Sequence, residues 1–259
     1  MEMIDTHAHL YEQQFDADRD AVIARAVAQG VRTMLLPNID TQTIQPMLDL
    51  CHRYPGHCYP MLGLHPTAVD RDFAQKLELM EPYLDDGRMT AIGETGIDLY
   101  WDKQYRDQQI EALHIQIGWA KQRRLPLVIH CRQSYHEVVT ALKQEQDGSL
   151  TGVFHCFPGN ERQADEVVAL GFMLGIGGVA TYKNADMAKV VRHTDIRHIL
   201  TETDAPYLSP SPYRGKRNES AYIFNIVQAI AEIKSMPAEK VAEHTVENAL
   251  KIFAINRGN

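Results

Sequence analysis

The chain has 259 residues, of which 44% are hydrophobic and 23% charged, a composition that excludes a disordered, collagen-like or coiled-coil protein. Four cysteines are too few for a disulfide scaffold of this size. The net charge of -8 excludes attraction of the whole surface to nucleic acid or an anionic membrane, so contact with phosphate must be local or made through metal ions. We find no signal peptide pattern and no apolar run of transmembrane length, and expect a cytoplasmic protein with reduced thiols, no membrane contact and no obligate protein partner.

Eight short apolar runs alternate with longer amphipathic segments along the chain. Valine, isoleucine, leucine and methionine dominate these runs, and most of the runs end near glycine, proline or aspartate, so they indicate buried strands. Their starts are about 28 residues apart on average, close to the length of one βα unit. The runs cover Met3–His7, Val31–Ile39, Cys58–Pro66, Met89–Asp98, Pro126–Cys131, Gly152–Pro158, Phe172–Gly178 and His198–Pro206.

Helical spacing of apolar residues between and after these runs predicts helices, the last of which caps or closes the fold. The predicted helices are Asp16–Gln29, Tyr105–Arg124, Glu161–Leu170, Glu219–Lys234 and Pro237–Phe253. Alternating strands and helices predict an α/β protein with a parallel sheet. Eight units favour closure into a single (β/α)8 TIM barrel over residues 1–259, with an extra C-terminal helix. The alternative, a doubly wound open sheet, usually brings a glycine-rich loop after the first strand, whereas here that strand ends in His7-Ala8-His9-Leu10.

Five of the twelve histidines fall at carboxyl ends of predicted strands, the positions that line the active site of an α/β barrel. These are His7, His9, His65, His130 and His155, and we expect surface or packing roles for the other seven. His7 and His9 are two residues apart, so strand alternation points both imidazoles into the barrel. Such a pair is half of a metal site, although two hydrogen-bonded core histidines would give the same pattern.

Glu94 lies at the end of the fourth apolar strand and Asp204 at the end of the eighth. Buried carboxylates must be paired, protonated or bound to metal, and a divalent cation supplies the missing charge. The six candidate ligands, enough for two metals bridged by one carboxylate, are His7, His9, Glu94, His130, His155 and Asp204. Imidazole suits Zn, Mn, Fe or Ni and carboxylates admit Mg, so the identity of the metal stays open.

Glu202 and Asp98 share strand parity with Asp204 and Glu94, which makes them candidates to orient a metal ligand or contact substrate, with hydrogen bonding to barrel backbone as the alternative. We place His65 nearer to the substrate than to the metal. Arg132 is the natural clamp for a phosphate or carboxylate, because a guanidinium grips such anions with two hydrogen bonds.

The longest structureless stretch is the loop Tyr207–Asn218, which contains Arg214 and Lys216. It is either a local basic surface for a DNA strand or a solvated surface segment. Cys131 and Cys156 each follow a proposed histidine ligand and have the opposite strand parity. We expect both to face the helices as small buried hydrophobic residues, with thiolate ligation as the minority alternative.

Six segments together resemble the TatD family of metal-dependent hydrolases and deoxyribonucleases, within the amidohydrolase-like barrels. In chain order they are Ile4-Asp5-Thr6-His7-Ala8-His9, Gly63-Leu64-His65-Pro66, Gly93-Glu94-Thr95-Gly96-Ile97-Asp98, His130-Cys131-Arg132, His155-Cys156-Phe157-Pro158-Gly159 and Glu202-Thr203-Asp204-Ala205-Pro206-Tyr207-Leu208. The resemblance implies one divalent metal held by His7, His9 and Asp204, a second held by His130 and His155, and Glu94 bridging them. It also implies that His65 and Arg132 contact the substrate phosphate. Tyr11 departs from the family pattern, which usually has Asp or Asn there, and so does Asn218-Glu219-Ser220, where the family often has Asn-Glu-Pro.

These observations lead to the hypothesis of metal-assisted hydrolysis of a phosphodiester, with DNA as the implied substrate and Asp204 as the candidate general base. Two alternatives stay open. One is a barrel hydrolase of an amide, lactone or carboxyl ester; the other is a catalytically silent, metal-dependent DNA-binding protein.

Overall fold

Eight parallel strands form the centre of the computed structural model, which describes residues 1–101, 103–183, 186–253 and 255. The strands are β1 (Met3–Asp5), β2 (Val31–Pro37), β3 (Cys58–Met61), β4 (Ile92–Asp98), β5 (Leu127–Arg132), β6 (Gly152–Phe154), β7 (Phe172–Ile176) and β8 (Ile199–Thr201). Each strand coincides with one of the eight predicted apolar runs, and only β5 extends beyond its run, by one residue, to Arg132. The predicted extent 1–259 includes residues 256–259, which lie outside the described residues.

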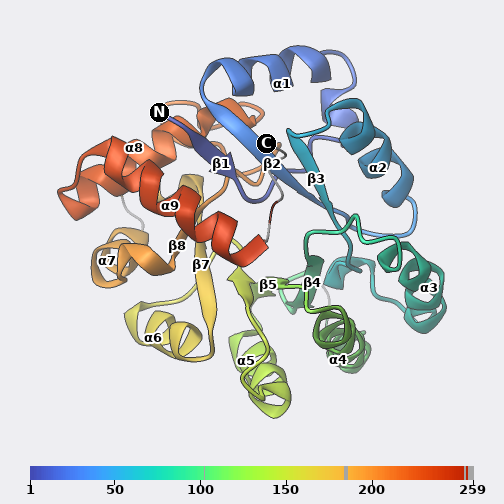
Figure 1. Ribbon diagram of the computed structural model, residues 1–259. Coiled ribbons are helices and arrows are strands. Elements are labelled where there is room, and N and C mark those ends of the chain that lie inside the picture. Colours follow the sequence, from blue (N-terminus) through green and yellow to red (C-terminus); the bar gives the residue numbers. More distant parts are fainter. Residues whose placement is uncertain (102, 184–185, 254, 256–259) are drawn as a thin grey trace.

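Helices surround the strands on the outside (Figure 1). They are α1 (Arg19–Ala28), α2 (Ile44–Arg53), α3 (Phe73–Met80), α4 (Arg106–Arg123), α5 (Tyr135–Glu145), α6 (Glu161–Ala169), α7 (Met187–His193), α8 (Ile223–Lys234) and α9 (Ala238–Phe253). The five predicted helices are confirmed with shifts of a few residues at their ends. Four more helices, α2, α3, α5 and α7, complete the alternation. None of the described helices is long and apolar enough to cross a membrane.

Two short contacts join the three-stranded and five-stranded parts of the sheet into a barrel. Between β3 and β4, Leu62 bridges Ile92, and the Gly93 N–H donates to the carbonyl of Leu62 at 2.9 Å. Between β8 and β1, Ala205 bridges Ala8, and the Asp204 N–H donates to the carbonyl of His7 at 2.9 Å. The second junction brings the residues after β1 and β8 side by side.

The inside of the barrel is filled by apolar side chains, and helix α9 closes its amino-terminal end. Each strand, or the residue just before it, contributes one buried side chain to an inner cluster: Ile4, Leu35, Met61, Ala91, Val128, Val153, Met173 and Leu200. Ala249 and Phe253 of α9 and the following Ile255 belong to the same cluster. Figure 1 shows α9 lying across this end of the ring of strands. The expectation that the last helix closes the fold is confirmed, and a polar site is left for the opposite, carboxyl-terminal end.

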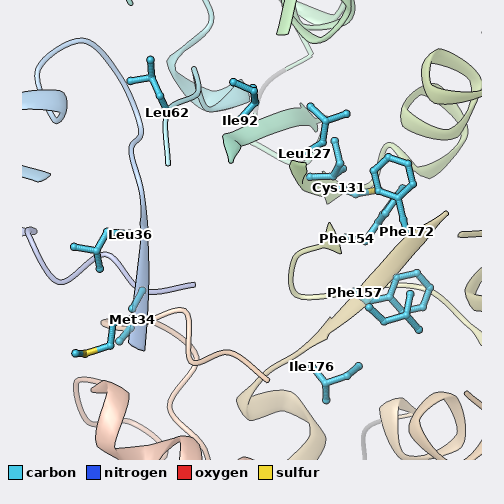
Figure 2. Packing of buried hydrophobic residues seen from close by; sticks show 14 of the residues in the cluster. Met34, Leu36, Leu62, Ile92, Leu127, Cys131, Phe154, Phe157, Phe172 and Ile176 are labelled. Carbon is cyan, nitrogen blue, oxygen red and sulfur yellow. The ribbon is translucent and has the colours of Figure 1, made fainter. Parts of the chain in front are cut away.

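A second apolar cluster packs the outer faces of the strands against the helices (Figure 2). Cys131 belongs to it, next to Phe154 and Phe172, and is 6% exposed, as its strand parity predicts. Cys156 does not follow its predicted parity. Its backbone turns at φ +43°, and the residue lines the cleft at the carboxyl end of the barrel instead. Burial raises the pKa of this thiol well above its usual value, so Cys156 stays uncharged.

Candidate metal centre

A cleft of about 790 Å³ opens at the carboxyl-terminal end of the barrel, where the sequence places the site. Its lining includes six of the residues selected from the sequence: His9, His65, Glu94, His130, His155 and Asp204. His7 lies beneath them and is fully buried. Asp98 and Arg132 also line the cleft.

The first donor set consists of two imidazoles and two carboxylates whose inner atoms converge. His7 Nε2 lies 3.2 Å from His9 Nε2 and 3.1 Å from Glu94 Oε2. Asp204 Oδ1 lies 3.5 Å from His9 Nε2 and 3.9 Å from His7 Nε2. Donor atoms bound at about 2.0–2.2 Å to a tetrahedral ion lie about 3.3–3.6 Å from one another. His7, His9 and Glu94 form a group that could hold one small divalent cation, and Asp204 lies close to both imidazoles of that group.

The second donor set faces the other oxygen of Glu94. Oε1 lies 2.9 Å from His130 Nδ1 and 3.8 Å from His155 Nε2. His155 stacks on His7 with ring centroids 3.4 Å apart, and its Nε2 is 3.8 Å from Asp204 Oδ1, so its imidazole stands between the two donor sets. Because each oxygen of Glu94 faces a different group of imidazoles, this carboxylate has the geometry of a bridge.

Outer partners assign the proton of two imidazoles to the nitrogen that points away from the cluster, and a carboxylate lies beside that nitrogen in a third. Tyr11 Oη donates to the carbonyl of Pro37 at 2.6 Å, so it can accept only from the Nδ1–H of His9, 3.1 Å away. Asp98 Oδ2 lies 2.9 Å from His130 Nε2, and Glu202 Oε1 lies 2.9 Å from His155 Nδ1. Asp98 accepts the proton of His130 and leaves the lone pair of Nδ1 free for a metal, whereas Glu202 pairs with His155 by proximity of charge, without a hydrogen bond to Nδ1.

The tautomer of His65 is the reverse. Its Nδ1 accepts a hydrogen bond from the Thr67 N–H at 3.1 Å, so the neutral ring carries its proton on Nε2. That Nε2 lies 3.4 Å from Glu94 Oε1 and 3.3 Å from His130 Nδ1. Distance alone groups His65 with Glu94 and His130 as potential ligands. The proton on Nε2 makes His65 a hydrogen-bond donor at this point.

Buried charges in the cluster shift several pKa values. Burial alone would raise the pKa of Glu94, but His65, His7 and His155 more than offset it, and the pKa falls well below its usual value. The pKa of His7 is lowered, first by burial and then by His155. Burial opposes the charge of His155, yet Glu202 and Glu94 raise its pKa to about 10. The acidic residues thus attract a cation strongly enough to hold a proton on this imidazole when no metal competes for it.

The inward direction of Glu94 depends on an irregularity in β4. The register of β4 against β5 shifts between Ile92 and Thr95. Ile92 packs in the outer cluster, and simple alternation would send Glu94 to that same face. The shift turns Glu94 into the cleft, where its side chain is 2% exposed. Along β5, by contrast, alternation is regular: Val128 belongs to the inner cluster, His130 lines the cleft, and Cys131 packs in the outer cluster, although it also borders the cleft.

Glu202 lies behind His155 and is almost fully buried. Its Oε1 accepts a hydrogen bond from the Cys156 N–H at 2.6 Å. Its Oε2 has no hydrogen-bond partner among the described residues. A Cβ atom at Gly175 would lie 2.3 Å from Oε2, so a glycine is required where this carboxylate packs.

Arg132 reaches the cleft beside two aromatic residues that follow β4. Its guanidinium lies 3.9 Å from the ring centroid of Tyr100 and 5.2 Å from that of Trp101. The loop Tyr207–Asn218 lines the cleft with other residues than the two basic ones selected from the sequence. Tyr207 and Leu208 line the cleft, whereas Arg214 lies 4.1 Å from the ring centroid of Tyr182, and neither Arg214 nor Lys216 is among the described lining residues. A DNA contact by these two residues stays a prediction.

Two residues of the site were missed by sequence reasoning. Asp5 is fully buried, accepts from the Thr203 N–H at 2.9 Å and from Thr203 Oγ1 at 2.6 Å, and so ties β1 to the segment after β8. Burial raises its pKa to about 7. The sequence does contain a sign of this role, because Asp5 is an acidic residue within an apolar run. Tyr11 was noted only as a departure from the family pattern, and nothing in the sequence indicates its contact with His9.

Three comparisons place the chain among known proteins. A family model described as TatD related DNase matches residues 4–254. The Bacillus subtilis protein named uncharacterized metal-dependent hydrolase YabD is 38% identical over 98% of this chain and 100% of its own length. The Pectobacterium carotovorum protein named 3'-5' ssDNA/RNA exonuclease TatD is 30% identical over 98% of this chain and 100% of its own length. The crystal structure of YjjV, a TatD homologue from Escherichia coli, matches with a TM-score of 0.92 at 28% identity, over 98% of both chains.

A TIM barrel whose carboxyl-terminal cleft gathers imidazoles around buried carboxylates defines the class of metal-dependent barrel hydrolases. The match of the family model extends over nearly the whole length. The chain belongs to the TatD family of metal-dependent hydrolases, as the six motifs predict.

Proposed function

We propose that this chain is a two-metal phosphodiesterase that hydrolyses DNA. The observation that supports this most directly is the position of Glu94, whose Oε2 is 3.1 Å from His7 Nε2 and whose Oε1 is 2.9 Å from His130 Nδ1. In this proposal His7, His9 and Asp204 would hold one divalent cation, His130 and His155 would hold the other, and Glu94 would be shared by the two. The relative named as a 3'-5' ssDNA/RNA exonuclease supports nucleic acid as the substrate class.

Two divalent cations would supply a metal-activated water and neutralise charge on the phosphoryl oxygens. Arg132 and His65 bind the phosphate, the guanidinium as a cation and His65 through its Nε2–H. Asp204 accepts the proton of the attacking water at its carboxylate, which lies within 3.5 Å of His9 Nε2. Asp98 and Glu202 orient His130 and His155 through the distal ring nitrogens.

The pKa of Asp204 fits a carboxylate that is ionised before the reaction. Burial would raise the pKa, but the neighbouring imidazoles of His9, His155 and His7 lower it below the usual value. Two predictions from the sequence, the cytoplasmic location and the single domain over 1–259, stay predictions alongside this proposal.

The test compares the wild-type protein with Glu94→Gln, which keeps the size of the side chain and removes its charge. Both proteins are stripped with a chelator, reloaded with Mg²⁺, Mn²⁺, Zn²⁺, Ni²⁺ or Fe²⁺, and incubated with single-stranded DNA whose product ends are mapped. We expect wild-type cleavage with about two bound metals per chain, and loss of both cleavage and metal in Glu94→Gln. Glu243→Gln, an exposed acid on α9, is the matched control and should behave as wild type.

A panel of phosphodiesters, lactones and carboxyl esters separates the proposal from its alternatives. Faster turnover of a lactone or carboxyl ester than of any phosphodiester would favour the barrel esterase alternative. Metal-dependent DNA binding without cleavage under every metal would favour the silent binding protein. Full phosphodiesterase activity in purified Glu94→Gln would overturn the assignment of this site.

A further inference from the structure

Exposed apolar side chains gather at the mouth of the cleft. Among the described residues, the large hydrophobic side chains that are exposed are Met1, Leu79, Tyr100, Trp101, Tyr207 and Leu208. The last four lie in two loops, and Trp101, Tyr207 and Leu208 line the cleft itself. Scattered exposed hydrophobic residues are normal on a protein surface, but their concentration beside a candidate active site is not.

The two loops stand on opposite sides of the mouth. Tyr100 and Trp101 follow β4, and Tyr207 and Leu208 follow β8, four places further around the ring of eight strands. Trp101 is 68% exposed, the largest fraction among these hydrophobic residues. The donor sets around Glu94 lie between the loops.

Trp101 is exposed but held in place. Asp98 Oδ1 accepts hydrogen bonds from the N–H groups of Tyr100 at 2.9 Å and Trp101 at 3.1 Å. The ring of Tyr100 meets the indole edge to face with centroids 5.0 Å apart. An aromatic surface whose backbone is already fixed loses little further freedom when a ligand stacks on it.

The neighbouring charge defines what kind of planar ligand fits. The Arg132 guanidinium lies 5.2 Å from the indole centroid and packs on Tyr100, so an anionic group in the cleft would be next to the aromatic surface. A nucleotide combines a flat base with a phosphate at this short range. In a duplex, stacked neighbours cover both faces of each base, whereas an unpaired base offers a free face.

We propose that Trp101 stacks on an unpaired nucleobase adjacent to the phosphate bound in the cleft, and that this contact makes the site select single strands over duplexes. The proposal rests on the proposed phosphodiesterase function for the presence of a nucleic acid strand. It adds a specificity residue that the metal centre itself does not contain.

Tryptophan fluorescence gives a direct readout of stacking. The chain has two tryptophans, and Trp119 is only 4% exposed, so quenching by a bound base reports mainly on Trp101. The metal-loaded protein is titrated with a phosphorothioate-linked deoxyadenosine oligonucleotide, which resists hydrolysis, and with a strand of the same length whose nucleotides are abasic. We expect quenching by the first strand and little by the second.

Binding and kinetics of variants complete the test. Because stacking on one aromatic side chain contributes severalfold or more to affinity, Trp101→Ala should weaken single-strand binding by about 5- to 100-fold. It should raise KM on single strands with little change in kcat, and leave duplex binding unaffected. Trp101→Phe should recover most of the affinity. Leu79→Ala removes another exposed apolar side chain and should match wild type.

The inference is overturned if the abasic strand quenches as strongly as the complete one, or if Trp101→Ala binds single strands like wild type. Its failure is distinct from failure of the proposed function. A protein that cleaves DNA equally well with and without Trp101 overturns the stacking and keeps the phosphodiesterase. Base-dependent quenching in a protein that cleaves no phosphodiester keeps the stacking and overturns the phosphodiesterase.

Discussion

The hydroxyl of Tyr11 lies 3.1 Å from His9 Nδ1 and donates its own proton to the carbonyl of Pro37 at 2.6 Å. Because the hydroxyl has a single proton, its contact with His9 requires the imidazole to be the donor. The lone pair of His9 then lies on Nε2, which faces Glu94 and Asp204 at 3.7 and 3.5 Å. A tyrosine thus accepts the outer proton of His9 as the carboxylate of Asp98 accepts that of His130.

The first prediction concerns this hydroxyl. Tyr11→Phe keeps the buried ring and leaves the His9 Nδ1–H without its acceptor, so metal affinity should fall about 10- to 100-fold. Isothermal titration with Zn²⁺ or Mn²⁺ measures the change. Tyr135→Phe also removes a hydrogen-bonded hydroxyl, which donates to Glu166 at 2.9 Å far from the cleft, and should leave metal affinity unchanged. Wild-type affinity in Tyr11→Phe would refute the role of the hydroxyl.

The second prediction compares two glycines of the cleft. In Gly175→Ala the new Cβ would lie 2.3 Å from Oε2 of the buried Glu202, so this carboxylate cannot keep its position beside His155. We expect a loss of about 1–3 kcal/mol in the free energy of unfolding, together with weaker metal binding. In Gly177→Ala the nearest atom, the Glu202 carbonyl oxygen, is 3.6 Å away, an ordinary contact. Urea titration should therefore separate the two variants, and equal midpoints would contradict the packing described here.

The third prediction concerns metal removal and stability. A ligand that binds only the folded state stabilises it by about 2.7 kcal/mol at a concentration 100-fold above its Kd. For a chain of this length that corresponds to a shift of roughly 5–10 °C in Tm. Melting curves recorded while Mn²⁺ or Zn²⁺ is titrated into chelated protein should show this rise in the wild type and a much smaller one in Glu94→Gln. If metal changed the Tm of neither protein, the assignment of this cluster as a metal site would be refuted.

The fourth prediction tests the closure of the barrel by α9. Phe253 is 1% exposed in the inner cluster, and Phe253→Ala should cost about 3–5 kcal/mol of unfolding free energy through lost burial and an unfilled cavity. Lys251→Ala, on the exposed side of the same helix, should change stability by less than about 0.5 kcal/mol. Chemical denaturation measures both. Similar values for the two variants would show that α9 does not pack as described.

The strand order and the barrel could be predicted because each strand is a distinct apolar run. Side-chain directions could also be predicted where a strand is regular. In β5, alternation directs His130 to the cleft and Cys131 to the outer cluster, as expected. The four additional helices are 7 to 11 residues long and were not predicted, although α2 has an amphipathic pattern, with Ile44, Met47 and Leu48 buried, that could have been found.

Side-chain direction was harder to predict where the backbone is irregular. The position of Glu94 at a strand end predicted that it points inward, but the structure achieves this through a register shift that simple alternation does not contain. Cys156 turned toward the cleft for a related reason, its positive φ directly after His155. Contacts between distant segments, such as Tyr11 with Pro37 or Asp98 with His130, depend on the closed barrel and have no local pattern.

The packing of α9 against Ile4, Leu200 and their neighbours has a consequence for any polymeric substrate. In the described part of the chain, side chains fill the interior at the amino-terminal end of the barrel. A polymer therefore cannot pass along the barrel axis from one end to the other. Polymer, attacking water and both products must share one entrance. The end of a polymeric substrate that reaches the bottom of the cleft would therefore move further in only after the cleaved product has left through the same opening.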